Sequence, residues 1–180
     1  IFSLPYLFFP RKYLEFAAKM WIRGIFFLLK YVCNITHEIQ GLENITSEPV
    51  IIASKHQSAF ETFALYYYIP KSLFIHKRQL FWIPIFGQYL KKINMISINR
   101  SESITAIRKI TKEAEIRISQ GYSIIIFPEG TRKKPGEVAN YKPGFVSIYN
   151  KVNCKILPVA VNSGKYWPKK ILIENSGKII

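Results

Sequence analysis

Residues 50–61 read VIIASKHQSAFE, and this stretch decides the fold. Its apolar half, residues 50–54, is a short continuous run that is typical of a strand buried on both faces. A second such run, residues 124–126, is followed by FPEGTR at residues 127–132. In open α/β sheets the active site lies beyond the carboxyl ends of the strands. We therefore expect the polar residues that follow the two runs to share one site.

The rest of the chain alternates between strand and helix patterns. We predict helices at 11–32, 58–68 and 103–119, and a loop with a broken helix at 79–91. Strands are predicted at 50–54, 73–76, 95–99, 122–127 and 155–161, with a further candidate at 38–41. Pro158 indicates an edge strand or a bulge. The pattern predicts an α/β fold with a mostly parallel central sheet flanked by helices.

The composition indicates one globular domain with an anionic partner. The chain has 180 residues, 49% of them hydrophobic, and a formal net charge of +15. Nucleic acid and membrane headgroups both fit that charge. The aromatic residues concentrate near the N-terminus, which favours a membrane, and no known nucleic-acid motif is present. We expect membrane phospholipids, and no nucleic acid, as partners.

Cofactor signals are missing from the sequence. The three histidines lack metal-ligand spacing, and neither a P-loop nor a GxGxxG motif occurs. We expect no metal and no nucleotide cofactor. Cys33 and Cys154 are expected to be free thiols, and Cys154 has no flanking base that would make it a nucleophile.

Residues 11–32 predict a basic amphipathic helix, whose apolar positions recur at intervals of three and four. Such a helix lies in a headgroup region or packs on its own domain, and the basic residues and Trp21 favour the headgroup region. We divide the chain into a membrane-associated helical segment, 1–35, and an α/β domain, 36–180. Residues 178–180 are expected to begin a strand, so we expect a C-terminal part beyond them. The apolar positions are Leu14, Ala17, Ala18, Trp21, Ile22, Ile25, Leu28, Leu29 and Val32.

His56 is the candidate general base, because a neutral imidazole accepts a proton near neutral pH. Glu61, five positions later, can orient it as a carboxylate partner. However, residues 58–61 also match the S-x-x-E capping box, in which Ser58 caps a helix and Glu61 reaches back to its amide. The two roles compete for one carboxylate, and the spacing leaves both open. A lone histidine is also often structural, and we assign that role to His37 and His76.

Cationic residues that follow predicted strands are candidate phosphate ligands. Arg132 lies near Glu129 and Gly130, where glycine permits close backbone approach and a guanidinium matches phosphate oxygens. Arg100 follows another predicted strand, and Lys77 and Arg78 follow a third as possible phosphate or oxyanion contacts. A surface turn with a solvated ion pair is the alternative for Glu129 and Arg132, and solvated charge is the default for the others.

Four blocks in this order closely resemble the 1-acylglycerol-3-phosphate acyltransferases of the PlsC-type lysophospholipid acyltransferase family. The first, residues 56–61, resembles the H-x-x-x-x-D block of that family. The second runs from IPIFG at 83–87 to INR at 98–100, the third is FPEGTR at 127–132, and the fourth is LPVAVNSG at 157–164. The resemblance covers residues 38–168. It departs in one position, since Glu61 stands where the family has aspartate.

The resemblance implies an activity and a site. His56 would remove the proton from the sn-2 hydroxyl of 1-acylglycerol-3-phosphate (lysophosphatidate). The oxygen would attack the thioester of acyl-CoA or acyl carrier protein, giving phosphatidic acid for phospholipid biosynthesis without a cofactor or metal. The substrate phosphate would be held by Arg100, Glu129, Gly130, Thr131 and Arg132.

The resemblance also implies a place in the cell, at the cytoplasmic face of a membrane, which we expect to be the bacterial inner membrane. Two alternatives stay open. The chain could act on another lyso-lipid, or it could be a catalytically silent lipid-binding module at the membrane surface.

Overall fold

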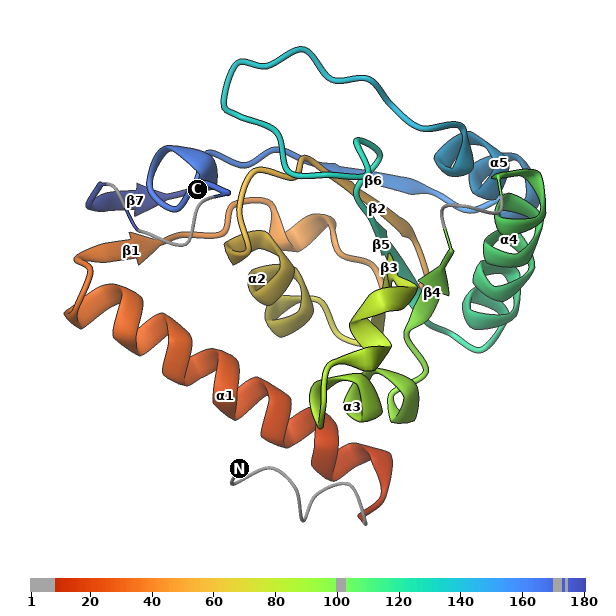
Figure 1. Ribbon diagram of the computed structural model, residues 1–180, viewed down its shortest axis with the longest axis horizontal. Coiled ribbons are helices and arrows are strands. Elements are labelled where there is room, and N and C mark those ends of the chain that lie inside the picture. The colour runs from red at the N-terminus through yellow and green to blue at the C-terminus, as the bar shows by residue number, and fades with distance from the viewer. Residues whose placement is uncertain (1–8, 100–102, 170–172, 174) are drawn as a thin grey trace.

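The computed structural model describes residues 9–99, 103–169, 173 and 175–180. Its centre is a five-stranded sheet in the order β4-β3-β5-β2-β6, in which every strand pair is parallel (Figure 1). The predicted α/β fold with a mostly parallel central sheet is confirmed. The strands are β2 (Ile51–Ser54), β3 (Ser72–Lys77), β4 (Ile96–Ile98), β5 (Ser123–Ile126) and β6 (Ile156–Val159).

The two apolar runs singled out in the sequence are neighbours in the middle of this sheet. Ile51 pairs with Ile124 and Ile52 with Ile125, and all four side chains are fully buried. The absence of alternation in both runs follows from this burial on both faces. The strand that contains Pro158 lies at the edge of the sheet, as predicted.

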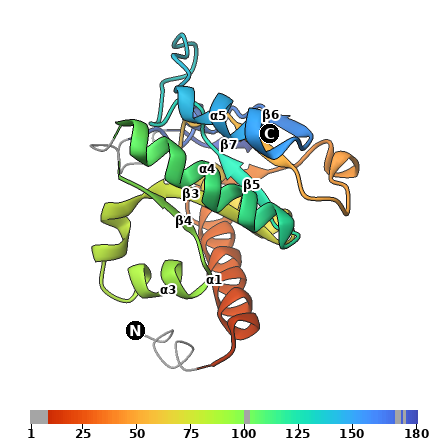
Figure 2. The same cartoon turned by 90° about the vertical axis from the view of Figure 1, so that its right-hand side faces the viewer.

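Helices cover both faces of the sheet. They are α2 (Phe60–Tyr68), α3 (Phe86–Lys92), α4 (Ser103–Ser119) and α5 (Pro143–Val152). The connection β2-α2-β3 runs toward one edge, whereas β4-α4-β5 and β5-α5-β6 run toward the other. Right-handed crossovers therefore place α2 on one face and the packed pair α4 and α5 on the opposite face. Figure 2 shows α4 and α5 side by side in front of the strands.

The paths of these crossovers create a switch point between β2 and β5. The chain leaves β2 toward one edge and leaves β5 toward the other, so the helices that follow them lie on opposite faces of the sheet. Such a point opens a crevice beyond the carboxyl ends of the two strands. The residues that directly follow β2 and β5 are those of the two motifs.

Two elements differ from the sequence-based expectations, and a third agrees with them. The strand expected at 38–41 is wrong, because the strand lies at β1 (Ile35–His37) and Gly41 has φ of 82°. β1 pairs in parallel with β7 (Gly177–Ile179), which agrees with the strand expected near residue 178. Helix α5 was not predicted. Pro143 and Gly144 suggest a loop in sequence, but proline fits the first turn of a helix, where no intrahelical amide is needed.

Helix α1 (Arg11–Tyr31) matches the predicted helix within one residue, but its apolar residues divide between two sides. One side packs on the α/β core through Leu14, Ile22, Phe26 and Leu29. The other side is exposed, and it is also apolar. No helix among residues 9–99, 103–169, 173 and 175–180 is long and apolar enough to cross a membrane. The exposed apolar residues of α1 are Tyr13, Phe16, Met20, Trp21, Phe27, Leu28 and Tyr31, and Val32 follows the helix.

His37 joins α1 to the rest of the molecule at the end of β1. Its ring lies 4.4 Å from that of Phe26 in α1, measured between centroids, and its Nε2 lies 2.7 Å from the hydroxyl of Tyr68 in α2. Burial lowers the pKa of His37. The structural role expected for this histidine fits its place in an aromatic cluster.

The lowered pKa of His37 predicts a loss of stability in mild acid. The unfolded chain takes up the proton at a higher pH than the folded protein, so the stabilisation is present above the ordinary histidine pKa of about 6.5 and is lost as pH falls. We expect the free energy of unfolding, measured with urea from pH 7.5 to 5, to fall less steeply for His37→Gln than for the wild type. His76, whose pKa burial also lowers, supplies a remaining slope. Identical slopes in the two proteins would contradict this assignment.

Candidate active site

The fold brings the two motifs into contact at the carboxyl ends of β2 and β5. His56 lies in the turn between β2 and α2, and Phe127 directly follows β5. Their rings stack with centroids 4.0 Å apart and planes inclined by 14°. The carbonyl of His56 also accepts a hydrogen bond of 2.8 Å from the amide of Lys133. The imidazole is thus held by ring packing and by its backbone.

Glu61 is fully buried beside His56. Its Oε1 lies 2.9 Å from Nδ1 of His56 and also accepts hydrogen bonds from the amides of Gln57 (2.6 Å) and Ser58 (2.7 Å). Its Oε2 accepts a hydrogen bond of 2.7 Å from the hydroxyl of Ser163. One oxygen of Glu61 therefore contacts His56 and also reaches back to the amide of Ser58. Ser58 is not the N-cap that the capping box predicts, because α2 begins at Phe60 and Ala59 precedes it.

This contact defines which ring nitrogen of His56 is available for chemistry. An ionised carboxylate only accepts hydrogen bonds, so the proton of the neutral imidazole lies on Nδ1. Nε2 is left with a free lone pair, which is the arrangement of a general base oriented by a carboxylate. His56 lines a large pocket, in which this lone pair can meet a hydroxyl group.

That pocket, with a volume of about 710 Å³, is lined by both cationic and apolar side chains. Its shape and chemistry suit an amphiphilic anion. The cationic side chains that line it are Lys77, Arg132, Lys142 and Lys169. The apolar ones include Phe74, Leu80, Ile98, Ile107, Ile110 and Phe145, contributed by β3, β4, α4 and α5 and by the segment that follows β3.

The structure gathers most of the residues predicted for the site, but not all. Gly130, Thr131, Arg132 and Lys77 line the pocket with His56. Arg78 instead begins the short 3-10 helix η3 (Arg78–Trp82), is exposed, and does not line the pocket. Arg100 lies outside the described residues.

Glu129 points into the protein rather than toward a phosphate. Its side chain is buried, and Nζ of Lys55 lies 2.7 Å from its Oε1. This close contact with the Glu129 carboxylate raises the pKa of Lys55. Because a carboxylate repels a phosphate, we assign Glu129 to holding Lys55 and the turn that follows β5.

Several site residues were missed in the sequence. The position of Phe127, inside a motif and directly after a buried strand, indicates a site residue. Nothing in the sequence indicates that its ring packs on His56. Ser163 lies in the fourth block without any mark of its contact with Glu61. The sequence does not indicate that Lys142 and Lys169 line the pocket, because their positions depend on the path that the chain takes after β5 and after β6.

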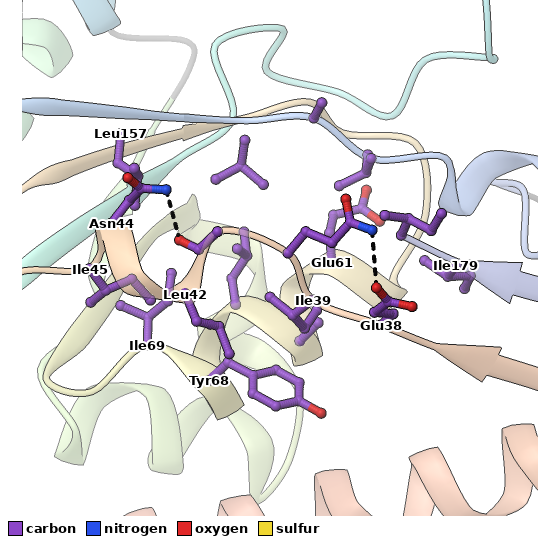
Figure 3. A pocket seen from close by; sticks show the side chains of 18 of the residues that line it. Glu38, Ile39, Leu42, Asn44, Ile45, Glu61, Tyr68, Ile69, Leu157 and Ile179 are labelled. Atoms are coloured by element: carbon purple, nitrogen blue, oxygen red, sulfur yellow. Dashed lines mark hydrogen bonds between the residues drawn. The ribbon is translucent and has the colours of Figure 1, made fainter.

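Glu61 also borders a second pocket, which lies between α2, the segment after β1 and strand β6 (Figure 3). This pocket, of about 500 Å³, is mostly apolar, and His56 is not among the residues that line it. Hydrogen bonds from Gln40 to Glu38 (3.0 Å) and from Asn44 to the carbonyl of Gly41 (3.2 Å) lie in its wall.

Within the described residues, no group of three His, Cys, Asp or Glu side chains could hold a metal ion.

The parallel α/β fold, with a histidine and a buried carboxylate at the wall of the pocket, can now be compared with known proteins. A family model described as Acyltransferase matches residues 36–162, and the chain belongs to this family. The resemblance noted from the four sequence blocks is confirmed.

Two relatives and one solved structure define the similarity further. The chain is 36% identical over 168 residues to a 1-acyl-sn-glycerol-3-phosphate acyltransferase of Pseudomonas aeruginosa, covering 93% of this chain and 65% of that protein. It is 32% identical over 135 residues to the enzyme of that name from Cocos nucifera, covering 74% and 44%. The crystal structure of the 1-acyl-sn-glycerophosphate acyltransferase PlsC from Thermotoga maritima superposes with a TM-score of 0.76 at 26% identity, covering 99% of this chain and 73% of that one. The chain thus spans about two thirds or less of the two relatives' lengths.

The environment of Glu61 predicts different effects for two substitutions. Glu61→Ala leaves two amides and a hydroxyl buried without their acceptor, and we expect it to lower the free energy of unfolding by about 3–5 kcal/mol. Glu61→Gln keeps a side-chain oxygen and is expected to cost less than half of that, as measured by urea unfolding. Neither carries the charge that stabilises a protonated His56, so a reaction in which His56 takes up a proton should be lost in both.

Glu48→Ala is the matched control, because this carboxylate is largely exposed. It should leave both stability and rate near wild type. Full acyl transfer by Glu61→Gln would show that the carboxylate serves only as a cap.

Proposed function

We propose that this chain carries the catalytic domain of an enzyme that acylates the sn-2 hydroxyl of 1-acylglycerol-3-phosphate and so forms phosphatidic acid. The observation that carries the proposal is the pair formed by His56 and Glu61 at the wall of a pocket lined by four cationic side chains. The printed names of the relatives support the same reaction. The proposal concerns the whole protein, of which this chain holds the histidine and most of the predicted anion site.

In the proposed reaction His56 acts as base and then as acid. Nε2 takes the proton of the sn-2 hydroxyl while the oxygen attacks the thioester carbonyl of the acyl donor. The negative charge of Glu61 stabilises the imidazolium that forms. When the tetrahedral intermediate collapses, the carbon–sulfur bond breaks, and the thiolate takes the proton back from Nε2. Because the hydroxyl attacks directly, no acyl-enzyme forms, and the step needs neither a metal nor a redox cofactor.

The cationic side chains that line the pocket supply the phosphate site. Arg132 offers a planar guanidinium that can bind two phosphate oxygens at once, and Lys77, Lys142 and Lys169 add positive charge around it. Thr131 adds a hydroxyl donor on the same wall. Arg100, which follows β4, stays a predicted phosphate ligand. The apolar side chains of the pocket, which come from the strands as well as from α4 and α5, can hold hydrocarbon next to the reacting carbonyl.

The acyl donor is proposed to be acyl-CoA or an acyl carrier protein. Both present a thioester at the end of a flexible phosphopantetheine arm, and both are anionic. The net charge of +15 favours the approach of either one.

The exposed side of α1 is proposed to bind the membrane that holds the lipid substrate. It presents aromatic and aliphatic side chains, such as Phe16, Trp21 and Leu28, along a helix that also carries basic residues. Such a surface inserts at the headgroup level, while the charges bind anionic lipids. We place the protein at the cytoplasmic leaflet, whose anionic surface attracts basic proteins.

Acyl transfer by the full-length protein tests the proposed reaction. We expect labelled acyl groups to move from acyl-CoA or acyl carrier protein to 1-acylglycerol-3-phosphate, and His56→Ala to lower the rate by at least about a hundredfold without unfolding the protein. Arg132→Ala should raise KM for the phosphate-bearing acceptor. A panel of lyso-lipids with other headgroups defines the acceptor.

An unchanged rate in His56→Ala would overturn the mechanism. Preference for another lyso-lipid would change the substrate but keep the chemistry. Lipid binding without any turnover would favour the silent binding module.

Vesicle binding tests the role of α1. The double variant Phe16→Ser, Leu28→Ser removes two exposed apolar side chains that lie outside the buried face of the helix. We expect it to bind vesicles of mixed phosphatidylglycerol and phosphatidylcholine at least about tenfold more weakly than the wild type in a sedimentation assay. Val138→Ser, at an exposed position in the loop between β5 and α5, is the control and should bind normally. Equal binding by all three proteins would exclude this side of α1 as the docking surface.

A further inference from the structure

Ser163 makes the longest-range contact of the proposed catalytic pair. It is fully buried, and its hydroxyl donates a hydrogen bond of 2.7 Å to Oε2 of Glu61, which lies 102 positions earlier in the chain. The other oxygen of Glu61 faces His56. The carboxylate is therefore held from two sides, by the turn before α2 and by a segment that follows β6.

The backbone around Ser163 fixes the place of its hydroxyl. Ser163 begins the 3-10 helix η4 (Ser163–Lys165), and its carbonyl accepts hydrogen bonds from the amides of Tyr166 (3.1 Å) and Trp167 (2.9 Å). Just before it, the side chain of Asn162 accepts a hydrogen bond of 2.8 Å from the amide of Ile180, beyond β7. The hydroxyl is presented by a segment that is tied down on both sides.

A second contact joins the same two segments. The amide of Gly164 donates a hydrogen bond of 3.1 Å to Oε1 of Gln57, the residue that follows His56. A Cβ at position 164 would lie only 2.8 Å from Cβ of Gln57, so this close approach requires glycine. The turn that carries His56 therefore packs directly against the turn that carries Ser163.

A glutamate carboxylate needs such support more than an aspartate carboxylate does. Glu61 has one more rotatable bond than aspartate, so its carboxylate can swing away from His56 unless its far oxygen is held. Three donors hold Oε1, but all of them come from the same turn, residues 56–58. Ser163 supplies the fixed point outside that turn.

We propose that Ser163 is a positioning residue, whose hydroxyl holds Oε2 of Glu61 so that Oε1 stays on Nδ1 of His56. The proposal rests on the proposed function, because its effect on rate is that of a correctly oriented base. Ser163 acts through Glu61 and does not touch the substrate. Its loss changes the rate of the chemical step and leaves the binding of both substrates as it is.

The test compares Ser163→Ala with Ser72→Ala in the full-length protein. Ser72 is also a buried serine, with a hydroxyl that donates to the carbonyl of Ile69, but it lies at the start of β3, at the opposite end of the sheet. We expect kcat to fall about tenfold in Ser163→Ala with KM within about twofold of wild type, and neither to change in Ser72→Ala. Rates are taken per folded protein, with the folded fraction measured by circular dichroism.

A double-variant cycle shows whether Ser163 acts through Glu61. Glu61→Asp withdraws the carboxylate by about one bond length, roughly 1.5 Å, and so removes it from the reach of Ser163. We expect Ser163→Ala to have no further effect in the Glu61→Asp background. A fall of the same size in both backgrounds, or an unchanged kcat in Ser163→Ala, overturns the proposal.

A proton NMR measurement separates this proposal from the proposed function. The Nδ1 proton of His56, hydrogen-bonded to a carboxylate, is expected to give a downfield resonance that is absent in His56→Ala. In Ser163→Ala it should move upfield or broaden, while in Ser72→Ala it should stay in place. An unchanged resonance in Ser163→Ala overturns the positioning role, whatever activity is found. Absence of acyl transfer in the wild type, with the resonance shifted as expected, overturns the reaction but keeps the contact.

Discussion

The architecture around the site depends on burying one negative charge. A carboxylate is costly to remove from water unless donors replace the water it loses. The side chain of Glu61 meets this condition with the His56 ring, two backbone amides and the Ser163 hydroxyl. These donors come from two segments about a hundred positions apart, the turn before α2 and the segment that follows β6. The carboxylate is therefore fully satisfied only in the folded arrangement in which these two segments are in contact.

The sheet topology decides where this carboxylate can meet a ligand. Because β2 and β5 are neighbours and the chain leaves them in opposite directions, α2 and α5 lie on opposite faces of the sheet, which leaves a crevice beyond the ends of the two strands. The motif after β2 supplies His56, and the motif after β5 supplies Phe127 and Arg132. Neither motif alone supplies all the residues of the proposed site. Their separation of about seventy positions in sequence disappears because Ile51 and Ile124 are partners in the sheet.

Local patterns in the sequence are enough to predict the central sheet and most of the helices. The helix at 103–119 has the predicted bounds, and the runs of isoleucine mark β2 and β5, because burial on both faces leaves a direct trace in composition. Helix α5 was missed, since Pro143 and Gly144 break helices in their interior but not in their first turn. The contact of Ser163 with Glu61 and the burial of Glu129 left no trace, because both depend on tertiary neighbours. The choice between orienting and capping for Glu61 was also undecidable from spacing, since one oxygen contacts both His56 and the amide of Ser58.

The stacking of His56 on Phe127 has a consequence for the movement of protons. A ring packed face to face at 4.0 Å, with Nδ1 bound to a buried carboxylate, is not free to turn over between one step and the next. In the proposed reaction a single atom, Nε2, must then collect the proton from the alcohol and deliver it to the departing sulfur. The two groups have to pass the same point in space in succession. The alcohol and the thioester must therefore approach from the same side of the imidazole edge, which limits how a lipid and a thioester can lie together in this pocket.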